Sequence, residues 1–333
     1  MIWTATAPGK ALLAGEYAVL QGAPAICVAV DRTASAFVAA GRGTSHSPFT
    51  VAALDAAARI ADDPSLLVSG ALAVDSTGLY QGRDKLGIGS SAAVTVAALG
   101  AALASRGVFV EETVAHNLPS DARWITRQAF FEAADLAHAE AQGARGSGVD
   151  IATAVFGGAI RFERGTSVKV TPATLPAGLA LTFVFTGESA STPALIGRVR
   201  QLAERDPQRH EEVMARLVAA AHAFADALAD AARTVAAAEA YGAAMAALGD
   251  AADAPIVTPA HAALRALAAE CGGAAKPSGA GGGDLGVVFT ATSDATLRVH
   301  RALQARPHNL SLLSLTAPAA GLSLTRGLMK EHV

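Results

Sequence analysis

A glycine-serine turn that leads directly into an apolar helix is the feature that most constrains this chain. Residues 85–94 read KLGIGSSAAV, in which Gly87 and Gly89 precede Ser90 and Ser91. The first N–H groups of a helix have no partner within the helix and carry the positive end of its dipole. Because glycine lets the backbone approach a ligand closely, the turn is suited to hold phosphate groups. An ordinary serine-capped helix fits the same residues.

Length and composition exclude several classes of protein. A chain of 333 residues is long for one core and predicts two domains. A formal charge of −3 gives no basic face for nucleic acid, so an anionic ligand must be held by local cations and backbone N–H groups. The two cysteines, Cys27 and Cys271, predict no disulfide framework. Without a recognisable secretory signal or spanning segment, we expect a cytoplasmic protein with no membrane partner. A monomer and a homodimer both fit these properties.

Strand and helix patterns mix in both halves of the chain, which predicts an α+β fold. Pro172 and Pro176 interrupt the pattern, and we place the boundary there, between domains 1–170 and 178–333. The predicted strands are residues 2–5, 25–30, 35–39, 179–185, 286–289 and 310–316. The predicted helices are residues 51–61, 91–106, 121–142, 192–204, 207–248, 259–271 and 294–305. Thr234 and Gly242 are candidate breaks in the helix over residues 207–248.

Two further segments accompany the glycine-serine turn. Residues 7–22 read APGKALLAGEYAVLQG, and residues 276–289 read KPSGAGGGDLGVVF. In this order and spacing, the three segments resemble the signature motifs of the GHMP small-molecule kinase superfamily. The resemblance spans most of the chain, and three ordered motifs are far more specific than one glycine-rich turn. It implies a two-domain GHMP kinase fold, with an N-terminal α/β domain like ribosomal protein S5 domain 2 and a C-terminal ferredoxin-like α+β domain.

The resemblance implies that the turn holds the phosphates of ATP. Phosphoryl transfer also needs Mg²⁺ with oxygen ligands, a cation near the transferred group and a carboxylate near the attacking group. The expected nucleotide contacts are Lys85, Gly87, Gly89, Ser90, Ser91 and Ala92. Ser91 is the expected Mg²⁺ ligand, with Glu140 as a second. Lys85 also fits a solvated loop lysine, and Glu140 an exposed carboxylate near a helix end.

Lys10 and Asp150 are the catalytic residues that the resemblance implies. Asp150 lies in GSGVDIA, residues 146–152, where a short acidic side chain also fits a helix N-cap. In the superfamily, the aspartate of this motif faces the acceptor group. A lysine beside it keeps the carboxylate ionised and stabilises developing charge, so we expect Lys10 to pair with Asp150.

Four local features resemble superfamily members whose acceptor already carries a phosphate. They are Tyr17 after Glu16, Lys85 before the glycines, AQG followed by GSGVD, and SAST at residues 189–192. Such an acceptor needs hydrogen-bond donors beyond those of the glycine-serine turn, residues 87–91, which we call the cradle. The expected acceptor contacts are Glu16, Tyr17, Arg145, Ser147, Gly148, Ser189, Ser191, Thr192, Lys276, Ser278, Gly279 and Asp284. Arg145 also fits a solvated loop residue, and Ser191 or Thr192 a helix cap.

The implied activity is ATP-dependent phosphorylation of (R)-5-phosphomevalonate to the 5-diphosphate in isoprenoid synthesis. Phosphorylation of mevalonate, or of another small molecule used by the superfamily, is the alternative. A related decarboxylase usually lacks the lysine of the APGK segment. A ligand sensor without turnover is expected to lose Lys10, Asp150 or the cradle serines, all of which are present here.

Overall fold

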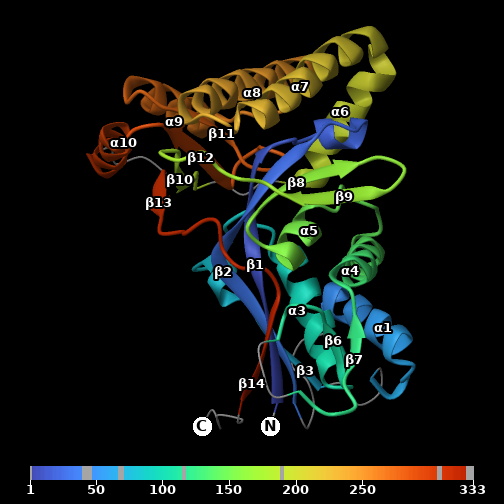
Figure 1. Ribbon diagram of the computed structural model, residues 1–333. Coiled ribbons are helices and arrows are strands. Elements are labelled where there is room, and N and C mark those ends of the chain that lie inside the picture. The colour runs from blue at the N-terminus through green and yellow to red at the C-terminus, as the bar shows by residue number, and fades with distance from the viewer. Residues whose placement is uncertain are drawn as a thin grey trace.

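An antiparallel sheet built on the long N-terminal strand organises the first half of the chain (Figure 1). The structure, a computed structural model, describes residues 2–39, 47–66, 71–114, 118–187, 191–305 and 310–327. The strand order is β14-β1-β2-β8-β9, and β3 also pairs with β2. The bounds are β1 Ile2–Ala14, β2 Ala25–Ala39, β3 Ala71–Asp75, β8 Ala159–Arg164, β9 Val168–Pro172 and β14 Ser323–Gly327.

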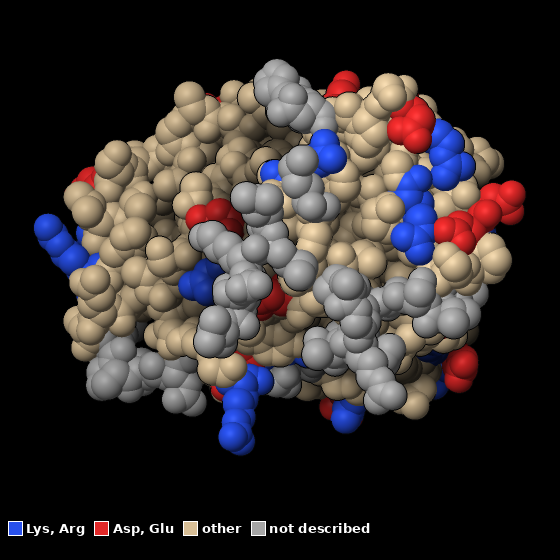
Figure 2. Space-filling model, turned by 90° about the horizontal axis from the view of Figure 1, so that it is seen from below, with Lys and Arg blue, Asp and Glu red and all other residues tan. Residues whose placement is uncertain are grey.

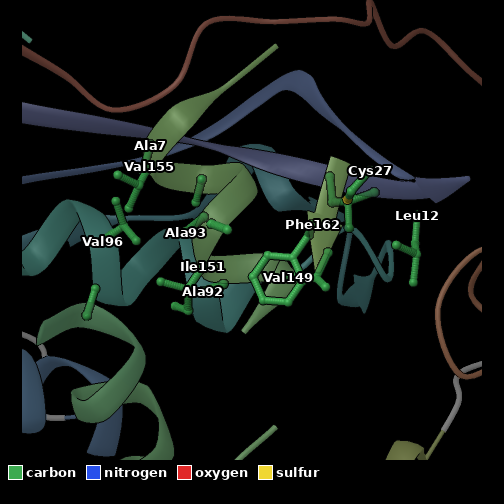
Figure 3. Packing of buried hydrophobic residues seen from close by; sticks show 14 of the residues in the cluster. Ala7, Leu12, Cys27, Ala92, Ala93, Val96, Val149, Ile151, Val155 and Phe162 are labelled. Carbon is green, nitrogen blue, oxygen red and sulfur yellow. The ribbon is translucent and has the colours of Figure 1, made fainter. Parts of the chain in front are cut away.

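Two helices pack directly on this sheet, and two more form an outer layer (Figure 1). The inner helices are α3 (Ser90–Ala104) and α5 (Val149–Phe156), and the outer ones are α1 (Pro48–Ala61) and α4 (Arg127–Gln142). Figure 3 shows Ala92, Ala93 and Val96 of α3 near Ile151 and Val155 of α5. Because the alanine side chain is a single methyl group, α3 can pack closely against both β1 and α5. The starts of α3 and α5 therefore lie near the same strand, β1.

A four-stranded antiparallel sheet, ordered β11-β12-β10-β13, organises the second half. Alternate residues of its strands enter different cores, as the pleat requires. Phe183 joins the large core with Phe224 and Tyr241, whereas Val184 joins a smaller cluster with Leu264. The bounds are β10 Ala180–Phe185, β11 Ala274–Pro277, β12 Leu285–Thr290, β13 Ser311–Leu313, α6 Thr192–Arg205, α7 Pro207–Ala227, α8 Ala231–Ala252, α9 Pro259–Glu270 and α10 Ser293–Ala305.

Short elements connect these parts. A hairpin precedes the glycine-serine turn, and a parallel pair precedes α4. Their bounds are η1 Ala18–Gln21, η2 Thr77–Leu79, β4 Tyr80–Gln81, β5 Asp84–Lys85, β6 Val108–Val110 and β7 Arg123–Ile125. The hairpin places the turn at the edge of the first sheet.

Two helices differ from the sequence prediction. The helix expected from residue 121 begins at Arg127, because Thr126 caps it by accepting a hydrogen bond from the N–H of Ala129, and the segment before it forms β7. The helix expected over residues 207–248, with candidate breaks at Thr234 and Gly242, is two helices, α7 and α8, that separate earlier, after Ala227. Asp230 caps α8 by accepting a hydrogen bond from the N–H of Arg233.

The last described strand returns to the first sheet. β14 pairs with β1 from Ile2↔Gly327 to Thr6↔Ser323, and Figure 1 shows the two strands side by side. Residues from both halves also share the large hydrophobic core. The region that we assigned to a second domain, residues 178–333, therefore contributes a strand to the first sheet, and the division near residue 170 stays a prediction.

Charged side chains are mixed on the surface. On the face seen from below in Figure 2, lysine and arginine alternate with aspartate and glutamate over a largely uncharged background. This mixture agrees with a net charge of only −3. Among the described helices, none is both long enough and apolar enough to cross a bilayer.

Candidate active site

The glycine-serine turn forms the entrance to α3. Gly89 is its N-cap and has a φ of +76°, and Gly87 has a φ of +70°. Both values lie in the left-handed region, which side chains with a β-carbon rarely adopt. The N–H groups of Ser90, Ser91 and Ala92 are in the first turn and have no intrahelical carbonyl to bond. The turn therefore has the geometry of an anion-binding helix N-terminus.

A bulge in β1 brings Lys10 to this turn. The register of β1 against β2 shifts between Pro8 and Gly9, where proline is tolerated because the ladder is interrupted. A β-carbon on Gly9 would stand 2.8 Å from the carbonyl oxygen of Ile88, and the N–H of Lys10 donates to that same oxygen at 2.8 Å. Glycine at position 9 is therefore required for β1 to hydrogen-bond the backbone of the cradle directly, and this places the next residue, Lys10, beside the cradle.

Lys10 and Asp150 form an ion pair beside the cradle. Lys10 Nζ lies 3.3 Å from Asp150 Oδ1, with 7% of the lysine side chain and 39% of the aspartate side chain exposed. Asp150 is in the first turn of α5, where a carboxylate is stabilised by the helix dipole. Burial lowers the pKa of Lys10, but Asp150, together with Cys27 and Glu16, outweighs burial, so the pKa of Lys10 is raised. The predicted pairing is confirmed, and Lys10 is positively charged at neutral pH.

The side chain of Ser91 is bound by a histidine from α4. His138 Nε2 lies 3.0 Å from Ser91 Oγ. The imidazole stacks on Phe49 of α1, with ring centroids 5.3 Å apart and planes at 27°. Burial lowers the pKa of His138, so its ring is neutral at pH 7. Three helices therefore meet at Ser91.

The third glycine-rich segment, residues 278–284, lies against the cradle. A β-carbon on Gly87 would stand 2.4 Å from Cβ of Asp284. Asp284 itself has a φ of +57°, and its carbonyl accepts from the N–H of Thr186 at 2.9 Å. A β-carbon on Gly279 would stand 3.8 Å from Lys10 Nζ. The three motifs that are far apart in sequence thus converge on Lys10, as the resemblance predicts.

Several predicted acceptor contacts lie in a junction between the two halves, which we call the seam; Glu16, Lys276 and Ser278 are buried there, and Tyr17 and Gly279 are partly buried. It joins Leu12, Gly15, Glu16 and Tyr17 at the end of β1 to Tyr241, Lys276, Ser278, Gly279 and Ala280. Ser278 Oγ accepts from the N–H of Leu12 at 2.8 Å, and the hydroxyl of Tyr17 donates to the carbonyl of Ala280 at 2.6 Å. The seam fixes the third glycine-rich segment to β1.

Glu16 and Lys276 form the centre of the seam. Lys276 Nζ donates to Glu16 Oε1 at 2.5 Å, and both side chains are almost fully buried. Lys276 also donates to the carbonyls of Leu12 and Pro277. Its three N–H bonds are therefore used inside the protein, which leaves none for an acceptor phosphate. The second oxygen of Glu16, Oε2, is buried and has no hydrogen-bond partner among the described residues. The geometry favours a structural ion pair for Lys276, and the expected acceptor contacts of Glu16 and Lys276 stay predictions.

A second group of predicted acceptor residues lies directly before α5. Asp135 of α4 is buried and pairs with Arg145 at 3.2 Å and with Arg164 at 3.9 Å. Gly148 has a φ of +84°, and a β-carbon there would stand 2.8 Å from Asp135 Oδ1. The side chain of Arg145 is 64% exposed, so its guanidinium is accessible to an anion. Ser147 lies between them and accepts from the N–H of Val149 at 3.4 Å.

The remaining predicted residues are spread around this centre. Glu140 pairs with Arg59 at 3.6 Å on the surface, and it lies two positions from His138, which is about 200° around the helix. It therefore faces away from Ser91, and the geometry gives it no part in a metal site there. Lys85 is exposed at the end of the hairpin, and Ser191 and Thr192 are exposed at the start of α6. Ser189 lies outside the described residues.

A comparison of sequences decides the family. Over 85% of this chain and 88% of the relative, the sequence is 31% identical to a phosphomevalonate kinase from Streptomyces sp. (strain CL190). The chain belongs to the phosphomevalonate kinase family. No protein-family model matches it.

Solved structures of phosphomevalonate kinases and other GHMP kinases share its fold. A Streptococcus pneumoniae phosphomevalonate kinase in complex with phosphomevalonate and AMPPNP has a TM-score of 0.75 at 17% identity, over 94% of this chain and 99% of that one. The Lin0012 protein from Listeria innocua has a TM-score of 0.82 at 22% identity, over 98% and 100% of the two chains. A mevalonate kinase from L. major, in complex with R-mevalonate, has a TM-score of 0.68 at 19% identity, over 95% and 96%. The expected α+β GHMP kinase fold is confirmed.

Sequence reasoning missed three residues that this phosphomevalonate kinase family member brings into the site region: Asp135, His138 and Tyr241. His138 carried one usable signal, since Gln142 follows it by four positions and shares its helix face. Tyr241 carried none, because its partners come from a distant part of the chain. Asp135 pairs with Arg145 only ten positions away, but the loop between them hides this contact from a pattern of helix spacing. Tyr241 accepts from the N–H of Gly15 and donates to the carbonyl of Glu16, across more than 220 positions.

Proposed function

We propose that this protein transfers the γ-phosphoryl group of ATP to (R)-5-phosphomevalonate, giving ADP and (R)-5-diphosphomevalonate. The observation that carries the proposal is the Lys10–Asp150 ion pair next to Gly89, at the mouth of the cradle. The Streptomyces relative is a phosphomevalonate kinase, and the pneumococcal enzyme binds phosphomevalonate and AMPPNP. Family membership and local geometry therefore support the same acceptor and the same donor.

The nucleotide is proposed to bind with its phosphates at the start of α3. Backbone N–H groups of Ser90, Ser91 and Ala92 supply donors, and Gly87 and Gly89 let the phosphates approach. Lys10 adds a full positive charge within the same region. A charged donor of this kind strengthens a phosphate hydrogen bond roughly twofold over a neutral one.

Residues at the cradle also fit a Mg²⁺ ion. Mg²⁺ prefers oxygen ligands and is usually held by one or two protein groups together with substrate phosphates and water. The hydroxyl of Ser91 and the half-exposed carboxylate of Asp150 are the oxygens that the site offers. No cluster of three His, Cys, Asp or Glu side chains able to hold a metal occurs within the described ranges, which fits an ion bound mainly through the nucleotide. When bound, Mg²⁺ would neutralise charge on the β- and γ-phosphates.

Positioning and charge neutralisation account for the chemistry. An oxygen of the acceptor phosphate attacks the γ-phosphorus, a new P–O bond forms, and the bond to the bridging β–γ oxygen breaks to release ADP. A phosphate monoester has its second pKa near 6 and is already anionic at neutral pH, so no strong base is needed. Asp150 holds Lys10 in place, and Lys10 stabilises the negative charge of the transferred group.

The acceptor phosphate is proposed to bind before α5. Arg145, Ser147 and Gly148 lie within a few residues of Asp150, and Arg145 presents an accessible guanidinium held from behind by Asp135. A guanidinium can bind a phosphate through two parallel hydrogen bonds. Asp284 and Gly279 border the opposite side of the cradle. Ser191 and Thr192 at the start of α6 remain proposed contacts from the second half.

An ADP-release assay tests the proposal. The purified protein is supplied with ATP, Mg²⁺ and either phosphomevalonate or mevalonate, with Lys10→Met as a control for contaminating activity. We expect phosphomevalonate to be turned over and mevalonate to give only background. Turnover of mevalonate alone would overturn the acceptor and leave a kinase, whereas no turnover of either would overturn the activity.

A further inference from the structure

His138 of α4 contacts the one cradle side chain proposed to bind Mg²⁺. Its Nε2 lies 3.0 Å from Ser91 Oγ, although the two residues are 47 positions apart. This is a contact between α3 and α4, and neither the family resemblance nor the proposed chemistry assigns a role to it. The proposed mechanism uses Lys10 and Asp150 for charge and Ser91 for the metal, and it gives His138 no role.

The tautomer of the ring sets which atom of this pair is the donor. With the ring hydrogen on Nδ1, Nε2 has one lone pair, and the hydroxyl of Ser91 donates to it at 3.0 Å. The side-chain amide nitrogen of Gln142 lies 3.4 Å from the same Nε2, and because an NH₂ group has only hydrogens to offer, this longer contact favours the same tautomer.

The imidazole is held in the orientation that this hydrogen bond needs. It stacks on Phe49 of α1 at 27° and 5.3 Å, so the ring plane is fixed on one side. His138 and Gln142 are four residues apart on α4 and therefore lie one above the other on the same helix face. The direction of the Ser91 hydroxyl is set by α1, α3 and α4 together.

We propose that His138 is a positioning residue, which holds the Ser91 hydroxyl hydrogen away from the nucleotide so that Ser91 Oγ presents its lone pairs to Mg²⁺. A neutral hydroxyl can bind a cation only if its hydrogen points away from the cation. This orientation is most favourable when a hydrogen-bond acceptor receives that hydrogen. His138 Nε2 is that acceptor. The inference rests on the proposed function only in requiring that a Mg²⁺–nucleotide complex binds at the cradle, whichever molecule is the acceptor.

Metal dependence of nucleotide binding separates this role from simple support of the fold. Outer partners of metal ligands typically contribute about 10- to 100-fold to metal affinity. We expect His138→Ala to weaken binding of ADP by that factor with Mg²⁺ present, and by less than about threefold in EDTA, because the backbone cradle is intact. His138→Gln, whose Oε1 can replace Nε2 as acceptor, should recover most of the loss. Isothermal titration calorimetry measures the ADP affinity of wild type and both variants, with Mg²⁺ and in EDTA.

Two further measurements keep the result interpretable. His222→Ala, on the exposed side of α7, is the matched control, and circular dichroism with thermal unfolding checks that each variant is folded. The affinity of the ADP complex for Mn²⁺, measured by electron paramagnetic resonance, should fall in His138→Ala. The double variant Ser91→Ala/His138→Ala should lose less affinity than the sum of the losses in the two single variants.

Three outcomes would overturn the inference. They are equal weakening of ADP binding with and without metal, no weakening at all, and no rescue by His138→Gln in a folded variant. If the wild-type protein binds Mg²⁺–ADP but phosphorylates a different acceptor, the proposed function fails and the role of His138 stands. If the wild-type protein binds no nucleotide, both proposals fail.

Discussion

Gly89 lies so close to Lys10 that a β-carbon at position 89 would stand 3.0 Å from Cγ and 3.2 Å from Cε of the lysine. The same β-carbon would stand 3.7 Å from Asp150 Oδ2. The glycine that caps α3 therefore does two things at once, because it adopts a left-handed backbone and leaves the space in which the ion pair forms. This contact joins the glycine-serine turn to the ion pair that we propose to be catalytic.

Replacing Gly89 by alanine should lower kcat by about 10²-fold, since a displacement near 1 Å at a reacting centre costs this much. Gly107→Ala is the matched control, because Gly107 has a φ of +70° beyond the other end of α3 and a β-carbon there meets nothing within 4 Å. Both variants carry backbone strain, and only Gly89→Ala displaces Lys10. Steady-state kinetics on the two proteins checks the difference, and equal kcat values would remove the contact from the mechanism.

Lys10→Met and Asp150→Asn should each lower kcat by roughly 10²- to 10³-fold, the usual effect of removing one electrostatic contact to a transition state. Folding should be little changed, because methionine fills the lysine space and Asp150 is half exposed. Lys169→Met, on the exposed part of β9, controls for the general loss of a cation. Kinetics and thermal unfolding are measured side by side, and wild-type kcat in either variant would contradict the assigned roles.

Glu16→Gln should destabilise the protein by about 3–5 kcal/mol, because it leaves Lys276 as a buried charge without its partner. The double variant Glu16→Leu/Lys276→Met should recover much of that loss, since a buried pair can be replaced by apolar side chains at little cost. The exposed pair of Arg298 and Asp294 is the control, and Asp294→Asn should change stability by under about 1 kcal/mol. Urea unfolding measures all three.

A raised KM for the acceptor in Glu16→Gln, at unchanged stability, would contradict the structural role of the seam. It would instead support Glu16 and Lys276 as substrate contacts.

Stability should fall as the pH drops below about 6.5, and His261 should account for part of the loss. Burial lowers the pKa of His261 to about 4, whereas the unfolded chain titrates near the ordinary value of 6.5. Between these values the unfolded state binds more protons, so acid favours unfolding, and stability present above pH 6.5 is lost toward pH 4. The expected loss between pH 7.5 and pH 5 is about 2 kcal/mol.

Urea unfolding of wild type and His261→Asn at both pH values isolates this contribution. The variant should lose less stability on acidification, whereas His222→Gln on the exposed side of α7 should behave like the wild type. An identical pH dependence in wild type and His261→Asn would show that His261 is not buried in its neutral form.

Local sequence signals were enough for the parts of the site that depend on backbone conformation. The glycine-serine turn leads into a helix as expected, and Asp150 lies in the first turn of another. Both features were predictable because each depends on a few neighbouring residues. The pairing of Lys10 with Asp150 joins distant residues and followed from the family resemblance instead. The interruption of β1 between Pro8 and Gly9 was not predicted, because a strand was expected there only over residues 2–5.

Contacts between distant elements were not predictable in the same way. Lys276 is a cation beside a glycine-rich loop, and only the packing of α8 and β11 on β1 shows that its charge is used by Glu16. The strand β14 is short and largely exposed, so it has no alternating apolar pattern to mark it. His138 lies on a helix in which alanine fits every face, and its partner is set by how α3 and α4 pack.

The seam begins two residues after Lys10 on the same strand. Leu12, Gly15, Glu16 and Tyr17 all bond groups that come from α8 or from residues 276–280. Tyr241 of α8 contacts Gly15 and Glu16, only five and six residues after Lys10 along the chain, so a change in α8 is expected to shift Lys10. Substitutions at positions 241, 276 and 278 are expected to be inherited together with changes at positions 12–17, and a variant of Tyr241 is expected to lose stability and activity together.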